Sequence, residues 1–249
     1  MKIIDKYSLN ARFYPMVLFY LPVLLLGILF SFQFDKITHQ LTSLGILSAV
    51  FFFIKQIGRD AGKVREKSLW EAWGGAPTTQ LLRWRNTTVD INTKKRYHLK
   101  LQTLFPIEKM PSQDFENSNP EEADAVYQAW TKYLISKTRD TKKYPLLFTE
   151  NVSYVFRRSL WGLKIYAIML LAVLMASTYI YYGITTKTYN PVGFPSLFII
   201  AEFGQLALIL LWIFKVTANW VRIPANVYAE RLMEAIESLK TESVKKEKP

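Results

Sequence analysis

The chain has 249 residues, of which 50% are hydrophobic and 15% aromatic, and a formal net charge of +12. This composition excludes a disordered tail and a small disulfide-stabilised domain. Because the chain has no cysteine, it also excludes a disulfide framework, thiolate catalysis and cysteine-ligated metal sites. The hydrophobic residues are concentrated in long uncharged segments, which predicts an all-α membrane protein.

Four uncharged segments predict transmembrane helices, since about 20 residues cross the hydrocarbon core. The first is residues 13–34, which is too long for a cleavable signal peptide. The second, residues 37–54, is shorter and more polar, and the third and fourth are residues 165–186 and about 194–214. The sequence therefore predicts two helical hairpins in the membrane.

Lysine and arginine are unequally distributed around these four segments. Residues 1–12, 55–164 and 215–249 contain three, twenty and seven of them, whereas the two short turns contain one each. Basic residues accumulate on the cytoplasmic side of a membrane. We therefore predict a multi-pass protein of the bacterial inner membrane with both termini in the cytoplasm.

Four parts follow from this topology. Residues 1–54 form the N-terminal segment and first hairpin, and residues 165–214 form the second pair of spans. A basic insert, residues 55–164, lies between them, and residues 215–249 form a cytoplasmic helix and tail. The insert contains four tryptophans ahead of its membrane-proximal end, enough large apolar surface for a folded core. They are Trp70, Trp73, Trp84 and Trp130.

The insert is predicted to be mostly helical. Residues 55–73 continue the second span as a helix that ends at Gly74 and Gly75. Residues 81–101 fit either a short strand pair or a broken helix. A helix from Asn119 to about Ile135 is indicated by a cap residue, a proline and two acids in its first turn. Residues 150–164 are predicted to lead into the third span as a helix.

The C-terminal segment is predicted to form a helix that starts at Pro224. Its apolar residues recur at spacings of four, three and four: Tyr228, Leu232, Ala235 and Leu239. Such a seam suits a coiled coil or helix bundle. Because it covers barely two heptads, it equally suits packing against the insert of the same chain.

No set of catalytic residues is recognisable. The only histidines are His39 and His98, and neither belongs to a metal-binding motif. Phosphate-binding, dinucleotide-binding and nucleophile-elbow motifs are absent from the sequence. We therefore predict a protein that is not an enzyme and uses no cofactor or metal.

The fourth span contains one acid, Glu202, which is costly in hydrocarbon unless it faces water or a partner. Gln205 lies three residues further on, and Gly204 would allow close approach of another helix. In a homo-oligomer, copies of Glu202 and Gln205 could line a cation-conducting pore. In the alternative, Glu202 lies near the membrane interface or bonds to Thr or Tyr side chains of the third span.

Basic and aromatic residues alternate in the insert, as expected of a site for a nucleotide or a single-stranded oligonucleotide. Such clusters also suit contact with an anionic membrane surface, which is the expected role of Arg157, Arg158 and Lys164. The candidate ligand-binding residues are Arg83, Trp84, Arg85, Lys94, Lys95, Arg96 and Arg139.

The segments Trp70-Glu-Ala-Trp-Gly-Gly-Ala-Pro-Thr-Thr, Thr138-Arg139-Asp140 and Trp161-Gly-Leu-Lys164 resemble a cassette of small bacterial membrane proteins. The layout of four spans and a basic insert is similar to membrane effectors of anti-phage defence of the Hailong type. The resemblance implies an ion channel controlled by a DNA oligomer that a nucleotidyltransferase partner makes. It is a resemblance of layout and charge, and it assigns no individual residue.

Together these patterns predict an oligomeric inner-membrane ion channel or pore-forming effector, gated by a nucleotide or oligonucleotide. Its partners would be the lipid bilayer, further copies of the chain and the ligand. The main alternative is a non-conducting adaptor that presents the insert to a protein partner. A transporter is less well matched, since four spans are few and no pair of broken helices is evident.

Overall fold

The computed structural model describes residues 9–31, 60 and 62–240, and within these ranges every regular element is a helix. The all-helical fold class is therefore confirmed for this part of the chain. The elements are η1 (Leu9–Phe13), α2 (Tyr14–Ser31), α4 (Glu66–Trp73), α5 (Pro77–Leu82), α6 (Ile91–Leu104), α7 (Gln113–Ser118), α8 (Pro120–Lys137), α9 (Pro145–Thr185), η2 (Pro191–Gly193), α10 (Ser196–Phe214) and α11 (Ala218–Ser238).

The chain divides into two compact units. Unit 1 comprises residues 1–66 and 152–221, and unit 2 comprises residues 67–151 and 222–249. Two of the divisions lie inside helices α9 and α11, so each of these helices contributes to both units. The uncharged segments predicted the corresponding boundaries at 164 and 215, where these segments begin and end.

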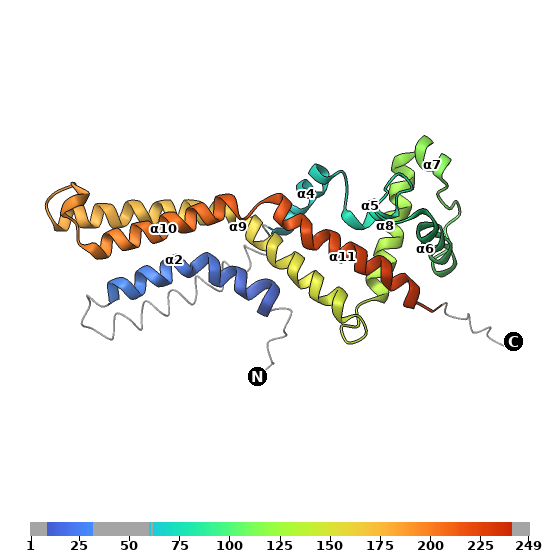
Figure 1. The fold of residues 1–249 in the computed structure, drawn as a ribbon, viewed down its shortest axis with the longest axis horizontal. Coiled ribbons are helices and arrows are strands. Elements are labelled where there is room, and N and C mark those ends of the chain that lie inside the picture. The colour runs from blue at the N-terminus through green and yellow to red at the C-terminus, as the bar shows by residue number, and fades with distance from the viewer. Residues whose placement is uncertain (1–8, 32–59, 61, 241–249) are drawn as a thin grey trace. The chain divides into compact units, whose positions relative to one another are not determined.

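Unit 1 is built from α2, α9 and α10, which lie side by side (Figure 1). Met16 and Phe19 of α2 pack against Leu163 and Leu171 of α9 and Trp212 of α10. The predicted juxtamembrane helix and third span form one continuous helix of 41 residues, α9. No proline or glycine pair interrupts it, so nothing in the sequence ends the helix between them.

Two helices, α9 and α10, are long and apolar enough to cross a membrane. They correspond to the predicted third and fourth spans. The first predicted span is helical as α2 over Tyr14–Ser31, and Tyr14–Gly27 is its described apolar stretch. The predicted second span, residues 37–54, lies outside the described residues, so the four-span layout stays a prediction.

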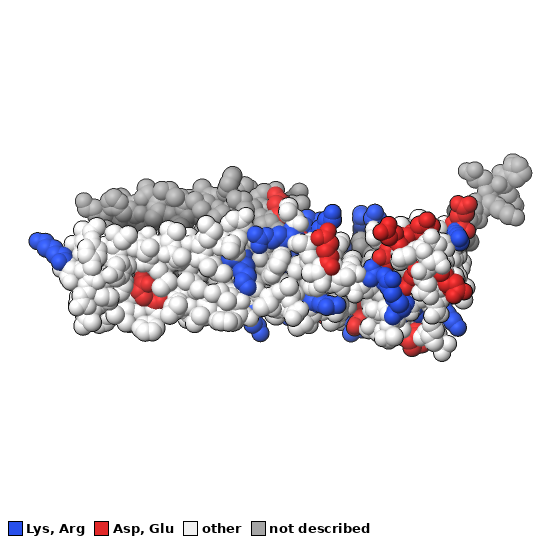
Figure 2. All heavy atoms as spheres, turned by 90° about the horizontal axis from the view of Figure 1, so that it is seen from above, with Lys and Arg blue, Asp and Glu red and all other residues white. Residues whose placement is uncertain are grey.

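The apolar side chains of α9 and α10 are mostly exposed. Only 33% of the most apolar window of α9 and 22% of that of α10 are buried, whereas a core helix of a soluble protein would be buried on most sides. Figure 2 accordingly shows a long stretch of surface with almost no charged side chains. This exposure favours lipid as the surrounding medium.

Unit 2 has its own hydrophobic core, formed by α5, α6, α8, the start of α9 and α11. Trp130 and Tyr127 of α8 are fully buried at its centre, together with Leu101 of α6. Leu232 and Ile236 of α11 complete it. The apolar seam of the C-terminal helix thus packs on the insert of its own chain, which resolves the two alternatives left open by the sequence.

Several predicted helix boundaries are confirmed. Helix α8 begins at Pro120, as its first-turn proline and acids indicate, although the Asn119 side chain makes no capping bond. Helix α4 ends at Trp73, and the next residues, Gly74 and Gly75, have φ angles of 83° and 126° that favour glycine.

One other expectation about secondary structure was wrong: Pro224 does not start the C-terminal helix but lies inside α11, which begins at Ala218. Of the two alternatives for residues 81–101, the structure shows the broken helix, since the end of α5, a loop and α6 occupy them. The Asp90 side chain caps α6 by accepting hydrogen bonds from the backbone N–H groups of Asn92 and Thr93.

Candidate functional site

The acid of the fourth predicted span is bonded within unit 1. The hydroxyl of Thr178 in α9 donates a hydrogen bond to the carboxylate of Glu202 in α10. Glu202 is half-buried, and the same hydroxyl lies 3.0 Å from the carbonyl oxygen of Leu174. This is the bond to a threonine of the third span that the alternative interpretation of Glu202 required. It joins the two candidate membrane helices through polar groups.

Gln205, the other predicted pore residue, lies on the packed face of α10. Gln205 is only 3% exposed, and Ala201 and Trp212 of the same helix are also buried. Within the described part of the chain, neither its amide nitrogen nor its amide oxygen has a hydrogen-bond partner. Gln205 therefore faces the interior of one protomer.

Three predicted ligand-binding residues are engaged inside unit 2. The guanidinium of Arg83 donates to both carboxylate oxygens of Asp124, at 2.8 and 2.6 Å. The indole N–H of Trp84 donates to the carbonyl oxygen of Pro111 at 2.9 Å. Lys94 is 1% exposed, and its ammonium donates to the carbonyl oxygens of Arg83 and Asn86. These bonds hold the loop between α5 and α6 in place.

Three others are exposed to solvent. Arg96 forms an ion pair with Glu237 at 2.7 Å, and its side chain is still 61% exposed. The Arg85 side chain is 52% exposed and lies 3.8 Å from Glu116. Lys95 is exposed on α6. These side chains remain accessible to a ligand, and their predicted role stays a prediction.

A buried carboxylate that the sequence analysis did not single out organises this region. Glu116 of α7 is 1% exposed. It accepts hydrogen bonds from the backbone N–H of Trp84 at 2.7 Å and of Arg85 at 3.3 Å, and from the hydroxyl of Tyr127 at 2.7 Å. Burial raises the pKa of Tyr127, and its bond to Glu116 raises it further. Charge and burial together make Glu116 a structural centre of unit 2.

His98 is fully buried beside this carboxylate, among the rings of Trp84, Tyr127 and Trp130. Its Nε2 donates to the carbonyl oxygen of Leu82 at 2.8 Å. Burial lowers the pKa of His98 to about 4, although the bond to Leu82 acts in the opposite direction. His98 is therefore neutral at pH 7.

The shifted pKa of His98 predicts a pH-dependent stability. Between pH 6.5 and about 4 the unfolded chain binds a proton at this histidine and the folded chain does not, so stability falls as the pH is lowered through this range. The full loss is on the order of 3 kcal/mol. Chemical denaturation of the wild type and His98→Gln should show a steeper decline for the wild type. Parallel pH profiles would contradict this assignment.

The remaining candidate, Arg139, lines a pocket. The pocket has a volume of about 230 Å³ and lies between the end of α8, the start of α9 and α11. It is lined by Ile135, Thr138, Arg139, Thr141, Leu147, Phe148, Asn151 and Tyr228. Arg139 is exposed, and within the described ranges neither its guanidinium nor the Asn151 amide makes a recorded hydrogen bond or ion pair.

The chemistry of this pocket suits a phosphorylated ligand with a planar ring. A guanidinium binds phosphate oxygens through several parallel hydrogen bonds. Asn151 offers both a donor and an acceptor, as a base edge requires, and Phe148 and Tyr228 offer aromatic surface. Sequence reasoning found Arg139 from its basic cluster. Asn151 and Tyr228 had no such signal, because only the fold brings them together.

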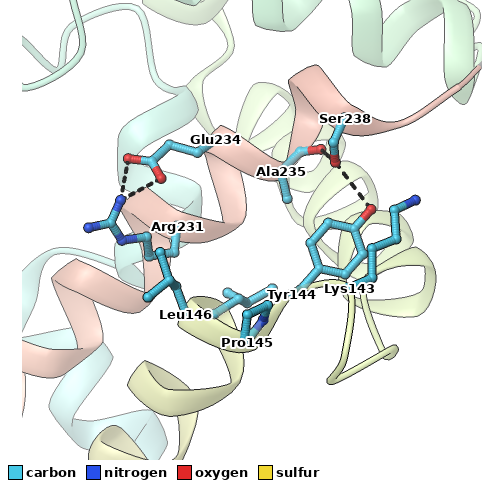
Figure 3. A pocket seen from close by; sticks show the side chains of 9 residues that line it. Lys143, Tyr144, Pro145, Leu146, Arg231, Glu234, Ala235 and Ser238 are labelled. Atoms are coloured by element: carbon cyan, nitrogen blue, oxygen red, sulfur yellow. Dashed lines mark hydrogen bonds and ion pairs between the residues drawn. The ribbon is translucent and has the colours of Figure 1, made fainter.

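A second pocket of about 290 Å³ adjoins the first, and both share Leu147. Figure 3 shows Lys143, Tyr144, Pro145 and Leu146 at the start of α9 facing Arg231, Glu234, Ala235 and Ser238 of α11. Arg231 pairs with Glu234, and Ser238 donates to the Tyr144 hydroxyl at 3.2 Å. The α11 side of this pocket is therefore internally bonded.

These features define an all-helical protein with two helices of membrane-spanning length and a separate helical unit that has a partly basic pocket. No protein family, curated protein or solved structure matches this chain.

Proposed function

We propose that this protein is an oligomeric ion channel or pore-forming effector of the bacterial inner membrane. In this proposal α9 and α10 cross the membrane, and unit 2 lies in the cytoplasm and binds a nucleotide or single-stranded oligonucleotide. Ligand binding changes the fraction of open channels. The protein itself catalyses no reaction.

The observation that carries the proposal is that one helix, α9, contributes residues both to the Arg139 pocket and to the contact with Glu202. Its first turns contribute Leu147, Phe148 and Asn151 to the Arg139 pocket. Further along the same unbroken helix, Thr178 binds the carboxylate of Glu202. In this proposal, a ligand bound at the start of α9 acts through this helix on Thr178 and so on the acid of α10. Packed helices with two discrete arrangements are the usual carriers of such coupling.

The cost of a charged or polar group in hydrocarbon supports an ion-conducting role. An acid at this depth costs several kcal/mol unless a function retains it. The Thr178 hydroxyl satisfies only one of the acceptor positions of Glu202. Water or a permeating cation would satisfy the others. The mostly exposed apolar faces of α9 and α10 are consistent with lipid and with contacts between copies.

Gating sets a quantitative requirement. Shifting a channel from mostly closed to mostly open takes about 5.5 kcal/mol of differential binding. One phosphate contact supplies roughly 1.5–3 kcal/mol, so a single pocket with one arginine is insufficient. Several copies that each bind a phosphorylated ligand, or one polyanion that spans several copies, would meet the requirement.

The resemblance in layout to Hailong-type effectors extends the proposal to a role in anti-phage defence. The ligand would then come from a partner enzyme and would control membrane depolarisation during infection. Loss of membrane potential in cells, dependent on Glu202 and on the ligand-producing partner, is the expected phenotype.

One observation favours a second function, a non-conducting adaptor anchored in the membrane. Because Thr178 already binds Glu202, the acid could simply join two anchoring helices while unit 2 presents a surface to a partner. Under this alternative, replacing Glu202 by glutamine would preserve activity, because an amide also accepts a hydrogen bond from threonine.

Ion flux in liposomes tests the proposed function. Purified wild type should release an entrapped cation in the presence of ATP or short single-stranded DNA, and Glu202→Gln should lower the rate by about tenfold or more, in line with the cost of losing a charged group from a cation path. Ser177→Ala is the matched control, since among the described residues Ser177 bonds only to the carbonyl oxygen of Val173 in its own helix. Equal flux in wild type and Glu202→Gln would favour the adaptor.

A further inference from the structure

Helix α8 has opposite charges at its two ends. Residues 107–126, around its start, contain six acids and a single lysine, although the whole chain carries a net charge of +12. The turn that follows its C-terminal end contains Arg139, Lys142 and Lys143. Helix α8 is 18 residues long, and the eleven positions from Val126 to its end separate the two regions by about 17 Å. They are therefore two distinct surfaces of unit 2 that cannot meet within one chain.

The acidic end has an apolar groove with a volume of about 590 Å³. Its apolar lining is Ile107, Phe115 and Val126, which are partly exposed side chains at the edge of the core. Glu108 and Glu122 line the same groove. In the described part of the chain neither carboxylate has a hydrogen bond or ion pair, so both are available to a cation.

The single base of this groove is Lys109, whose ammonium lies 4.3 Å from the centre of the Phe115 ring, in a cation–π contact. The groove therefore carries two acids and one base. Unpaired acids around an apolar floor are a surface for a basic segment with an apolar anchor.

The basic end of α8 presents such a segment. Lys142 and Lys143 are exposed, and among the described residues neither forms an ion pair. Their backbone N–H groups donate hydrogen bonds to the carboxylate of Asp140, at 2.9 and 3.2 Å. These bonds fix the conformation of the turn. Leu146 follows and is 62% exposed, and Figure 3 shows it on the Arg231 side of the pocket, across from Lys143. The turn thus combines two bases with one exposed apolar side chain.

We propose that the acidic groove binds the basic turn of a second copy of this chain. Leu146 of one copy would enter the groove between Phe115 and Val126, and Lys142 and Lys143 would pair with Glu122 and Glu108. Because the two surfaces differ, the contact is heterologous, and in the proposed oligomer its repetition would form a closed ring. The inference rests on the oligomer of the proposed function and names the contact that builds it.

Charge complementarity argues for a second copy as the occupant. The groove offers Glu108, Glu122 and an apolar floor, and residues 142–146 supply two bases and the exposed Leu146. One of these bases, Lys143, also contacts its own Tyr144 ring, with the ammonium 5.2 Å from the ring centre. Each copy supplies one groove and one turn, so a closed ring leaves no unpaired surface. Arg139 belongs to the same turn, so a ligand bound in the Arg139 pocket would lie next to the subunit contact.

Charge reversal tests this contact. The groove variant carries Glu108→Lys and Glu122→Lys, the turn variant carries Lys142→Glu and Lys143→Glu, and a third variant combines all four changes. Lys132→Glu with Glu230→Lys is the matched control, since both residues are exposed and lie on neither surface. The mass of the full-length protein is measured in detergent and in nanodiscs over a range of concentrations at low salt.

Each two-residue variant should raise the concentration at which the oligomer dissociates by about tenfold or more, and the combined variant should restore it. Restoration would not occur if the substitutions merely damaged the fold. A monomeric wild type or an oligomer insensitive to both reversals would overturn the inference. So would a combined variant whose oligomer dissociates as readily as those of the two-residue variants. An oligomer insensitive to these changes that still conducts ions would leave the proposed channel intact.

Discussion

Replacing Glu116 with alanine is expected to destabilise unit 2 by about 3–5 kcal/mol, the usual cost of removing one partner from a buried charged network. The substitution leaves the backbone N–H groups of Trp84 and Arg85 and the hydroxyl of Tyr127 without their acceptor. It also removes the larger of the two opposite charges, those of Glu116 and Asp90, that counteract the lowering of the Lys94 pKa by burial. Three donors would then lack their acceptor in the core.

Chemical denaturation followed by the fluorescence of the buried tryptophans measures this effect. Glu116→Gln should cost less than Glu116→Ala, because the amide oxygen still accepts two of the three bonds. Glu121→Ala is the control, since Glu121 is an exposed acid of the same region and should change stability by less than about 0.5 kcal/mol. Equal losses for Glu116→Ala and Glu121→Ala would show that the buried carboxylate does not organise unit 2.

The helical fold was predictable because local signals determine it. Uncharged segments of about 20 residues indicate apolar helices wherever they occur. Proline and two acids after Asn119 mark the start of α8, and the glycine pair after Trp73 ends α4. These signals act over a few residues, so no knowledge of tertiary contacts is needed to recognise them.

The roles of the basic residues were less predictable, because they depend on partners far along the chain. Arg83 pairs with Asp124, 41 positions away, and Glu116 binds the backbone of Trp84, 32 positions away. A cluster of basic and aromatic residues has the same sequence pattern whether it binds a ligand or supports a loop. Lys94 supports a loop in this fold, whereas Arg139 reaches a pocket.

The long helix α9 was also only partly predictable. Charge marked residue 165 as the start of a span, since Lys164 is the last base before the uncharged segment. The helix begins at Pro145, five positions before the predicted juxtamembrane helix, and continues into the span without a break. Lys164 is accommodated by donating to the carbonyl oxygens of Ile213 and Val216, both at 2.9 Å, which satisfies the end of α10.

Arg139→Ala is expected to weaken binding of a phosphorylated ligand by roughly 10- to 100-fold, the usual loss when a charge-assisted contact of 1.5–3 kcal/mol is removed. The variant should also show a smaller dependence of affinity on salt, because one phosphate contact is missing. Lys132→Ala, an exposed base of α8 outside the pocket, is the control. Titration of the full-length protein in detergent with ATP and short single-stranded DNA measures both affinities.

Unchanged binding in Arg139→Ala, together with binding in the wild type, would move the ligand to another surface. The exposed bases Arg85, Lys95 and Arg96 would then be the next candidates. Loss of binding in both Arg139→Ala and Lys132→Ala would indicate attraction by overall charge and not by the pocket.

Current across a planar bilayer, recorded while the ligand is titrated, separates the two roles assigned to α9. We predict that Arg139→Ala shifts the ligand concentration for half-maximal response without changing the conductance of an open channel, and that Glu202→Gln changes the conductance at an unchanged ligand concentration. Wild-type protein that is inserted in the bilayer, binds the ligand and yet passes no current would contradict a ligand-gated channel.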